Sequence, residues 1–357
     1  MSARLQRVTL LITAAVLLAG GCATQPEDLL APDYDPELLS GRVLFGEVVE
    51  ISEATSFDVL ATDDAMVEFV QGHISEQRQS VVRLKRLLSR LEHAGYFNAY
   101  QIDATRTALD TFHTQSGNCL SYTNMFIALA RLAGLNAGYQ IVEMPPTWDA
   151  ESGYLIRNNH INVIVHSIRW ERFENSEFTV DFGSVQPAAH FNKKLVSDGY
   201  AQSLFYSNLS VDQSVTGNHR LAFAYLKRAI LIEPRNSDLW VNLGALYNVR
   251  EQPELAIKAF EVVLDLDPGN KAAWSGLERS YTLSGQHELA LVYERKVRNY
   301  RENNPCYHYA MAQAAYKTAD YDLAITSVDR AIKLNNKDGR FHFLKALSHG
   351  QLGDEEN

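Results

Sequence analysis

Apolar residues recur every three to four positions over long stretches of the chain, and this spacing predicts amphipathic helices. The clearest early example has its apolar face at Val81, Leu84, Leu87, Leu88 and Leu91. Gly95 suits the end of this helix. Two short apolar groups farther upstream, residues 43–45 and 48–51, are typical of strands. We therefore expect the N-terminal half of the chain to combine helices with strands.

A different pattern begins near residue 203 and returns every 34 residues. The recurring positions are Ala222, Ala256, Ala290 and Ala324, Pro234 and Pro268, Trp240 and Trp274, and Tyr247 and Tyr281. A fixed period of this length is the signature of stacked repeats. We expect four repeats that end near residues 234, 268, 302 and 336, followed by a partial helix at 340–352 that caps the array.

The second copy of the repeat combines small and aromatic residues in a fixed order, which is Trp240, Leu243, Gly244, Tyr247, Ala256, Phe260 and Pro268. Small residues let two antiparallel helices approach closely, aromatic side chains fill the gaps between pairs, and proline ends the second helix. This order resembles the tetratricopeptide repeat. The resemblance implies a helical solenoid whose groove binds a polypeptide, and the alternative is an array that only supports the other domain. The third copy departs from the pattern, because Glu294 stands where the second has Phe260.

The N-terminus has the composition of an export signal. Arg4 and Arg7 precede an apolar run, residues 8–18, that is shorter than the roughly 20 residues a membrane-spanning helix needs. Small residues then lead into a cysteine, in the order Ala19-Gly20-Gly21-Cys22. This order resembles the bacterial lipobox, which implies removal of residues 1–21 and a lipid on Cys22. The alternatives are a plain secretory signal or a fortuitous cysteine.

The segment after the signal is expected to be a tether. Residues 22–40 contain Pro26, Pro32 and Pro36 among acidic residues, a composition that favours an extended chain. Ala23, and not aspartate, follows the cysteine. By resemblance to Gram-negative sorting, this implies the outer membrane, with the protein facing the periplasm, and in any host the bacterial cell envelope.

Composition and length narrow the classes of function. The 357 residues carry 43 acidic and 33 basic side chains, a net charge of −10 that becomes −12 without the signal peptide. Such an acidic chain does not bind nucleic acid or anionic lipid through its overall field. The length fits two domains, which we place at 41–200 and 203–357. Besides Cys22 the chain has only Cys119 and Cys306. The sequence does not exclude a disulfide between these two residues. We expect Cys306 to have a structural role.

One segment of the middle third carries the residues for covalent chemistry. It predicts a helix with Asn118 as its N-cap and Gly134 at its end. Cys119 then lies in the first turn, where free N–H groups and the positive end of the helix dipole stabilise a thiolate. A thiolate in this place suits nucleophilic catalysis. The other interpretation is that Cys119 is a small buried side chain in a helix.

A cysteine nucleophile needs a base, and the base needs a group that orients it. Two alternating segments, residues 159–165 and 177–183, predict strands. His160 lies in the first strand and Asp181 in the second. If the strands are neighbours and pack on the Cys119 helix, the three side chains converge.

This arrangement resembles the transglutaminase-like superfamily, a branch of the papain-like folds, over residues 65–190. The resemblance implies an antiparallel sheet packed on the cysteine helix, with Cys119 as nucleophile, His160 as base and Asp181 as the residue that orients the base. Members that crosslink proteins often have tryptophan after the nucleophile, and Leu120 here favours hydrolysis over transfer to lysine. The superfamily also includes proteases, amidases and inactive scaffolds.

Other residues are alternatives for the same roles. His166 is a second candidate base at the other end of the strand, and His190 lies in a loop where we expect a surface residue. Asp149 is an alternative orienting residue in a proline-containing loop. For the oxyanion, the candidates are the backbone N–H of Cys119 and the side chain of Gln115.

Motifs for other chemistries are absent from the sequence: it contains no phosphate-binding loop, dinucleotide glycine motif, H-E-x-x-H or C-x-x-C. A zinc site from Cys119, His160 and Asp181 is conceivable by ligand type, but the spacing does not require one. The sequence predicts an α+β papain/transglutaminase-like domain followed by an all-α tetratricopeptide-repeat solenoid, with no cofactor or metal. The expected function is a lipid-anchored, cysteine-dependent amide hydrolase or acyltransferase whose repeats recruit a polypeptide substrate or an envelope protein. The alternative is a non-catalytic envelope adaptor.

Overall fold

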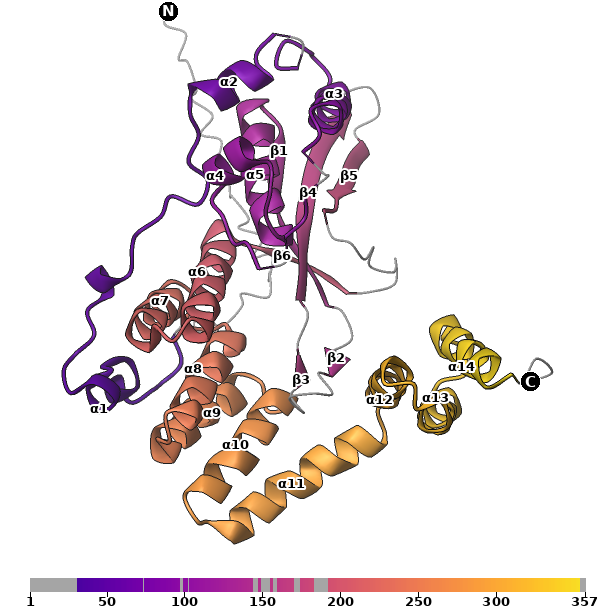
Figure 1. Cartoon of the computed structure of the whole chain (residues 1–357). Helices are drawn as coiled ribbons and strands as arrows, with labels where there is room; N and C mark the ends of the chain where they lie inside the picture. Colours follow the sequence, from indigo (N-terminus) through magenta and orange to yellow (C-terminus); the bar gives the residue numbers. More distant parts are fainter. Residues whose placement is uncertain are drawn as a thin grey trace, which may run out of the picture. The chain divides into compact units, whose positions relative to one another are not determined.

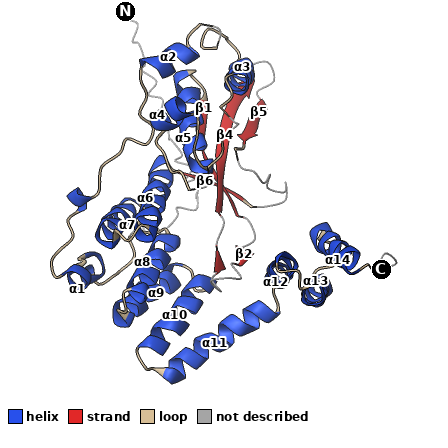
Figure 2. Cartoon of the chain, viewed as in Figure 1, coloured by secondary structure: helices blue, strands red, loops and turns tan. Residues whose placement is uncertain are grey.

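The computed structural model describes residues 31–72, 74–96, 99–101, 103–143, 147–148, 155–156, 159–169, 174–182 and 192–353 (Figure 1). These residues form a small α+β region followed by a run of helices, as the colouring by secondary structure shows (Figure 2). The predicted signal peptide with Cys22, as well as Asp149 and His190, lie outside the described residues. Within the described part of the chain, no helix has both the length and the apolar character needed to span a bilayer.

The α+β region is built on a four-stranded antiparallel sheet with the strand order β5–β4–β1–β6. The strands are β1 (Asn136–Glu143), β4 (Asn159–Arg169), β5 (Glu174–Val180) and β6 (Lys193–Val196). A separate pair, β2 (Thr147–Trp148) and β3 (Leu155–Ile156), is also antiparallel. The register of β4 and β5 sets Val163 opposite Val180, so that the residue after β5 lies beside Asn162.

Four helices accompany the sheet: α2 (Asp64–Val70), α3 (Ser80–His93), α4 (Ala108–Thr114) and α5 (Cys119–Leu132). Helix α3 confirms the first predicted helix, and Gly95 beyond its end has a φ of 80°, a conformation that glycine adopts without strain. Helix α5 packs along β1 and β4 (Figure 1). Its residues 120–130 are all buried, which fits a helix that is apolar on nearly every side. The start of α5 is therefore held in place by a rigid core.

The two apolar groups near residue 45 do not form strands, so this prediction was wrong. Residues 43–45 lie in the short helix α1 (Arg42–Phe45), and the second group leads into a 3₁₀ turn, η3 (Ile51–Glu53). Their apolar side chains pack on the repeats: the ring centroids of Phe45 and Phe223 are 5.9 Å apart, and Val49 is fully buried. Short apolar runs do not by themselves distinguish strands from other buried segments, and distant helices decide the structure here.

The end of the expected tether is also folded. Residues 36–39 form a 3₁₀ turn, η2 (Pro36–Leu39), which begins at Asp35 as N-cap and buries Leu38 and Leu39. The extended chain that we expected for residues 22–40 therefore does not describe its last part, because these apolar side chains belong to the hydrophobic core.

The helical run has the predicted period. Its helices are α6 (Asp198–Val215), α7 (His219–Ile232), α8 (Ser237–Val249), α9 (Pro253–Leu266), α10 (Lys271–Leu283), α11 (His287–Glu302), α12 (Pro305–Lys317), α13 (Tyr321–Leu334) and α14 (Gly339–Leu352). Helices α6 to α13 form four pairs, and α14 follows as the predicted capping helix. The first helix begins at Asp198, slightly before the expected boundary at 203. All four recurring alanines are buried.

Phe260 shows how the repeats pack. A Cβ atom on Gly244 would lie 2.6 Å from the Phe260 ring, and one on Gly276 would lie 2.2 Å from it. Both distances are far below van der Waals contact, so the ring fits between α8 and α10 only because these residues are glycine. Glu294 occupies the corresponding position of α11, and the described core divides beyond this repeat, with α12, α13 and α14 sharing a smaller cluster of their own.

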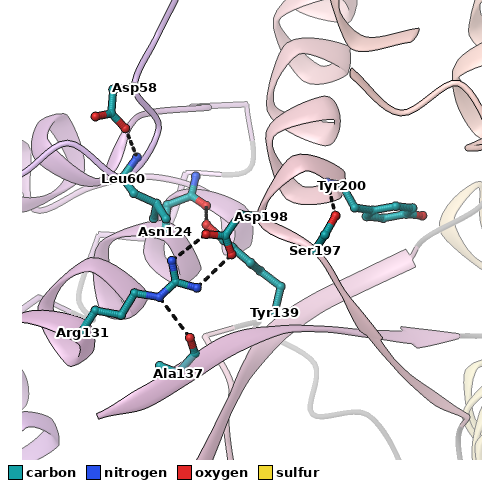
Figure 3. A network of polar contacts seen from close by, with 9 residues as sticks. All are labelled: Asp58, Leu60, Asn124, Arg131, Ala137, Tyr139, Ser197, Asp198 and Tyr200. Carbon is teal, nitrogen blue, oxygen red and sulfur yellow. Dashed lines mark hydrogen bonds and ion pairs between the residues drawn. The ribbon is translucent and has the colours of Figure 1, made fainter. Parts of the chain in front are cut away.

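A polar network joins helix α5 and the sheet to the first repeat helix (Figure 3). Arg131, near the end of α5, donates two hydrogen bonds of 2.6 and 2.8 Å to the carboxylate of Asp198, the first residue of α6. Its Nε also donates to the Ala137 carbonyl of β1, at 3.1 Å. The hydrogen bonds from Arg131 hold the pKa of Asp198 below its usual range. A bidentate pair of this kind fixes the orientation of both groups.

Candidate active site

The first turn of α5 is fixed by its N-cap. The Ser121 N–H donates to Asn118 Oδ1 at 3.0 Å, and the side-chain Nδ2 of Asn118 donates to Thr105 Oγ1 at 2.9 Å. The Ser121 hydroxyl donates to the Ala104 carbonyl and accepts from the Arg106 N–H, at 3.0 and 2.8 Å. Residues 104–106 are thereby held against the turn that carries Cys119.

Gly117 allows this close approach. A Cβ atom at this position would lie 2.5 Å from Cβ of Ser121, and the Gly117 carbonyl accepts from the Gln101 N–H at 3.0 Å. Cys119 follows as the first residue of α5 and is half-buried. Its sulfur therefore lies at the positive end of the helix dipole, as predicted from the sequence.

The sheet brings His160 and Asp181 together. His160 lies near the start of β4, and Asp181 directly follows β5, which begins earlier than predicted and ends earlier, at Val180. His160 Nε2 is 2.7 and 2.8 Å from the two carboxylate oxygens of Asp181. Their side chains are only 10% and 14% exposed, so this pair is largely removed from water.

Asn162 is a further member of this cluster. It lies on the same side of β4 as His160, and its Nδ2 donates to Asp181 Oδ2 at 3.2 Å. Asn162 is 1% exposed, so its position is fixed by packing. The alternation of β4 reveals the shared side, but the hydrogen bond to Asp181 depends on the register with β5. Asn162 therefore orients the carboxylate that faces His160.

The His160 side chain also hydrogen-bonds the Cys119 side chain. Since Nε2 faces Asp181, the ring nitrogen left for the sulfur is Nδ1. Burial lowers the pKa of His160, but the hydrogen bonds to Asp181 and Cys119 and the nearby negative charge outweigh it and raise the pKa to about 9. At neutral pH the ring is thus protonated beside the Cys119 sulfur.

Tyr100 is a site residue that sequence reasoning missed. Its backbone forms a bridge with Gly117, and its hydroxyl contacts Cys119 twice, by hydrogen bonds to the side chain and to the backbone N–H. Burial, and then the nearby sulfur, raise the pKa of Tyr100, so the phenol is neutral at physiological pH. This contact depends on the chain returning to the start of α5, which no local pattern reveals.

The alternative residues have other partners. His166 Nδ1 is 3.5 Å from Glu177 Oε1, toward the opposite end of β4 from His160. Gln115 is exposed, has a left-handed φ of 51° at the end of α4, and hydrogen-bonds Tyr96 through its side chain. The oxyanion role of Gln115 therefore stays a prediction, without a contact that supports it.

The two described cysteines are free thiols, so the disulfide between Cys119 and Cys306 that the sequence left open is not formed. Cys306 lies at the start of α12, where its N–H donates to Asn304 Oδ1 at 2.8 Å, and burial raises the pKa of its thiol. Among the residues that the structure describes, no group of three or more histidine, cysteine, aspartate or glutamate side chains is arranged to hold a metal ion.

Family models match the two parts of the chain separately. Residues 67–174 match the transglutaminase-like superfamily, and residues 213–271 and 309–357 match the tetratricopeptide repeat. The chain thus has a transglutaminase-like core domain followed by tetratricopeptide repeats. The predicted resemblance is confirmed for both parts. Cys119 and His160 lie within the first match, and Asp181 lies just beyond its end.

Comparison with solved structures finds partial similarity. A MamA protein is 16% identical, with 43% of this chain and 85% of that chain covered and a TM-score of 0.27. MamA from Desulfovibrio magneticus RS-1 is 19% identical, with coverage of 45% and 89% and a TM-score of 0.28. YrrB, a tetratricopeptide-repeat protein with an unusual peptide-binding site, is 17% identical, with coverage of 43% and 79% and a TM-score of 0.27. No curated protein matches the chain.

Proposed function

We propose that this protein is a cysteine-dependent hydrolase of amide bonds in polypeptides, with acyl transfer to an amine as the alternative fate of its intermediate. The observation that carries the proposal is the position of His160, which hydrogen-bonds Asp181 on one side and Cys119 on the other. These are the nucleophile, base and orienting group that thiol catalysis requires. The transglutaminase-like core supports this chemistry.

The proposed reaction starts from an ion pair in which Nδ1 of His160 holds the proton and the Cys119 sulfur is a thiolate. The thiolate attacks the amide carbonyl carbon, the C–N bond breaks, and His160 returns the proton to the departing amine, which leaves a thioacyl-enzyme. Water then attacks the thioester while His160 takes its proton, and the sulfur leaves as thiolate with release of the acid. Asp181 accepts the Nε2–H hydrogen bond throughout and balances the imidazolium charge.

The backbone N–H of Cys119 is the proposed donor to the oxyanion. In the structure this N–H is hydrogen-bonded by the Tyr100 hydroxyl, so the phenol oxygen marks the position for a substrate carbonyl oxygen. Substrate would displace the Tyr100 hydroxyl when it binds. Leu120, in place of the tryptophan common in crosslinking members, is the reason for preferring hydrolysis.

The same contact of Tyr100 favours one alternative function, a non-catalytic envelope adaptor in which the covered thiol is inert. Labelling with an electrophilic probe that mimics an acyl donor separates the two. We expect wild type and Cys306→Ala to be labelled at Cys119, and Cys119→Ala to show no labelling. Equal labelling of wild type and Cys119→Ala contradicts the assignment of the nucleophile.

The proposed location is the bacterial envelope, with a lipid on Cys22 and, in a Gram-negative host, the outer membrane. The order of residues around Cys22 supports this proposal. Labelled palmitate should enter the wild-type protein and be lost in Cys22→Ala, while Cys306→Ala keeps it. A lipid-free wild-type protein would exclude the anchor. The repeats would recruit the polypeptide substrate or an envelope partner.

A further inference from the structure

The second repeat holds a segment of its own chain. The Tyr34 ring packs on Trp240 of α8 with centroids 4.8 Å apart, and Trp240 is fully buried. One residue later, Asp35 forms an ion pair of 2.7 Å with Lys258 of α9. An aromatic ring and its neighbouring carboxylate are thus bound together by a tryptophan and a lysine of one helix pair.

The main chain of this segment is bound as well. The Tyr247 hydroxyl of α8 donates to the Leu38 carbonyl at 2.9 Å in a buried contact. Farther along, Lys227 Nζ donates to the Val49 carbonyl at 2.7 Å. The segment at 33–39 reads Asp-Tyr-Asp-Pro-Glu-Leu-Leu. The structure therefore displays a ligand class for these repeats, an acidic segment with an aromatic ring.

The tryptophan and the tyrosine of this surface return one repeat later, whereas Val292 stands at the position that corresponds to Lys258. Helix α10 begins and ends 34 residues after α8, so that Trp274 and Tyr281 correspond to Trp240 and Tyr247. Trp274, however, is only half-buried. Lys271 Nζ lies 4.0 Å from the centre of its ring and Lys296 Nζ lies 5.5 Å from it. This tryptophan is therefore partly exposed, and two lysine ammonium groups lie beside its ring.

Two tyrosines extend this surface. Lys271 Nζ is 5.4 Å from the Tyr300 ring, and Lys296 Nζ is 4.9 Å from the Tyr293 ring. We call Lys271, Trp274, Tyr293, Lys296 and Tyr300 the α10–α11 patch.

The patch also differs from the repeat before it. The α9 positions that correspond to Tyr293 and Lys296 are Ala259 and Val262, which are 0% and 4% exposed. A basic aromatic surface thus replaces an apolar packing face, in a chain whose net charge is −10. Charge and ring chemistry together favour an acidic ligand with an aromatic side chain.

We propose that the α10–α11 patch binds an acidic, aromatic segment of the Asp-Tyr-Asp-Pro type from a partner polypeptide. Its ring would pack against Trp274 as Tyr34 packs against Trp240, and the flanking carboxylates would pair with Lys271 and Lys296. The inference deepens the proposed function, because such a segment would bring a polypeptide to the domain that carries Cys119. Binding itself needs no thiol.

The test uses the full mature chain with Cys119→Ala and a fluorescein-labelled peptide of residues 32–39. The second repeat is already filled by the chain's own segment, so the peptide reports on the patch. We expect saturable binding by fluorescence anisotropy that weakens at least about tenfold in Trp274→Ala and in Lys296→Glu. Lys333→Glu, an exposed lysine of α13, is the matched control and should change the affinity less than about twofold.

Circular dichroism melting of each variant separates loss of the patch from loss of the fold, and Lys296→Gln provides a milder second variant. A peptide with both aspartates replaced by asparagine should bind at least about tenfold more weakly. Absence of binding to the folded chain, or binding that Trp274→Ala and Lys296→Glu leave unchanged, overturns the proposal. Peptide binding by a protein whose Cys119 resists every probe would leave the patch intact and contradict only the proposed catalysis.

Discussion

Asp181→Asn tests the electrostatics of the site while keeping its shape. In the wild type, Nε2 of His160 lies 2.7 and 2.8 Å from the carboxylate, and the two side chains are only 10% and 14% exposed. Burial lowers the pKa of His160, and the hydrogen bonds to Asp181 and Cys119 raise it to about 9. Without the carboxylate charge, burial dominates, and we expect the pKa of His160 to fall to about 6.5 or below.

This difference has a consequence for stability. A pKa raised from about 6.5 in the unfolded chain to about 9 in the folded one corresponds to about 3 kcal/mol at most. The stabilisation is fully present below about pH 6.5 and is lost as the pH rises through about 9, because the ring then loses its proton in both states. Wild type should therefore lose more stability than Asp181→Asn between pH 6 and pH 9.5.

The assay is NMR titration of the His160 ring, assigned with His160→Gln, together with calorimetric unfolding at pH 6, 7.5 and 9.5. Glu177→Gln is the matched control, because it removes a carboxylate 3.5 Å from His166 on the same pair of strands. It should leave the pKa of His160 unchanged. A wild-type His160 that titrates at 6.5 or below, or that titrates identically in Asp181→Asn, would refute the reasoning.

Three further predictions follow from other contacts. Tyr100→Phe removes the hydroxyl that contacts Cys119, and we expect iodoacetamide to alkylate Cys119 several-fold faster in this variant than in the wild type. An unchanged rate would mean that the phenol does not cover the sulfur. Gly117→Ala places a Cβ 2.5 Å from Ser121 Cβ and should lower the free energy of unfolding in urea by about 1–3 kcal/mol. Gly138→Ala, where a new Cβ has nothing within 4 Å, should lower it far less. Equal losses of stability in the two variants would contradict the close approach at Gly117. Arg131→Ala breaks the exposed ion pair with Asp198 and should lower the free energy of unfolding by about 0.5–1 kcal/mol, and by less in high salt. A loss of stability that does not depend on salt would exclude an ionic contribution from this pair.

The repeats and the start of α5 could be predicted because their signals are local. A residue and its counterpart 34 positions later occupy the same place in successive helix pairs, so the period alone indicates the architecture. Asn118 as N-cap and Cys119 in the first turn follow from the preferences of a helix start. His160 was predicted from the alternation of its strand. These features depend on neighbours within a few residues or on a strict repeat.

The remaining features depend on contacts between distant parts of the chain. Residues 43–45 lie in a short helix whose Phe45 packs on Phe223 of the first repeat, and no pattern near residue 45 records that contact. Tyr100 reaches Cys119 through a bridge to Gly117, and Asn162 reaches Asp181 through the register of β4 with β5. A sequence pattern shows which side of a strand a residue occupies, but not which side chain lies across from it.

The measurement that tests the central claim most directly is detection of a thioacyl intermediate. The full chain is mixed with peptide substrates, quenched with acid and analysed by intact mass spectrometry, with Cys119→Ala as the control. The account predicts an acyl adduct on Cys119 that hydroxylamine removes and that is absent from Cys119→Ala. An adduct that survives in Cys119→Ala, or a wild-type Cys119 that acquires no acyl group from any amide substrate, would contradict it.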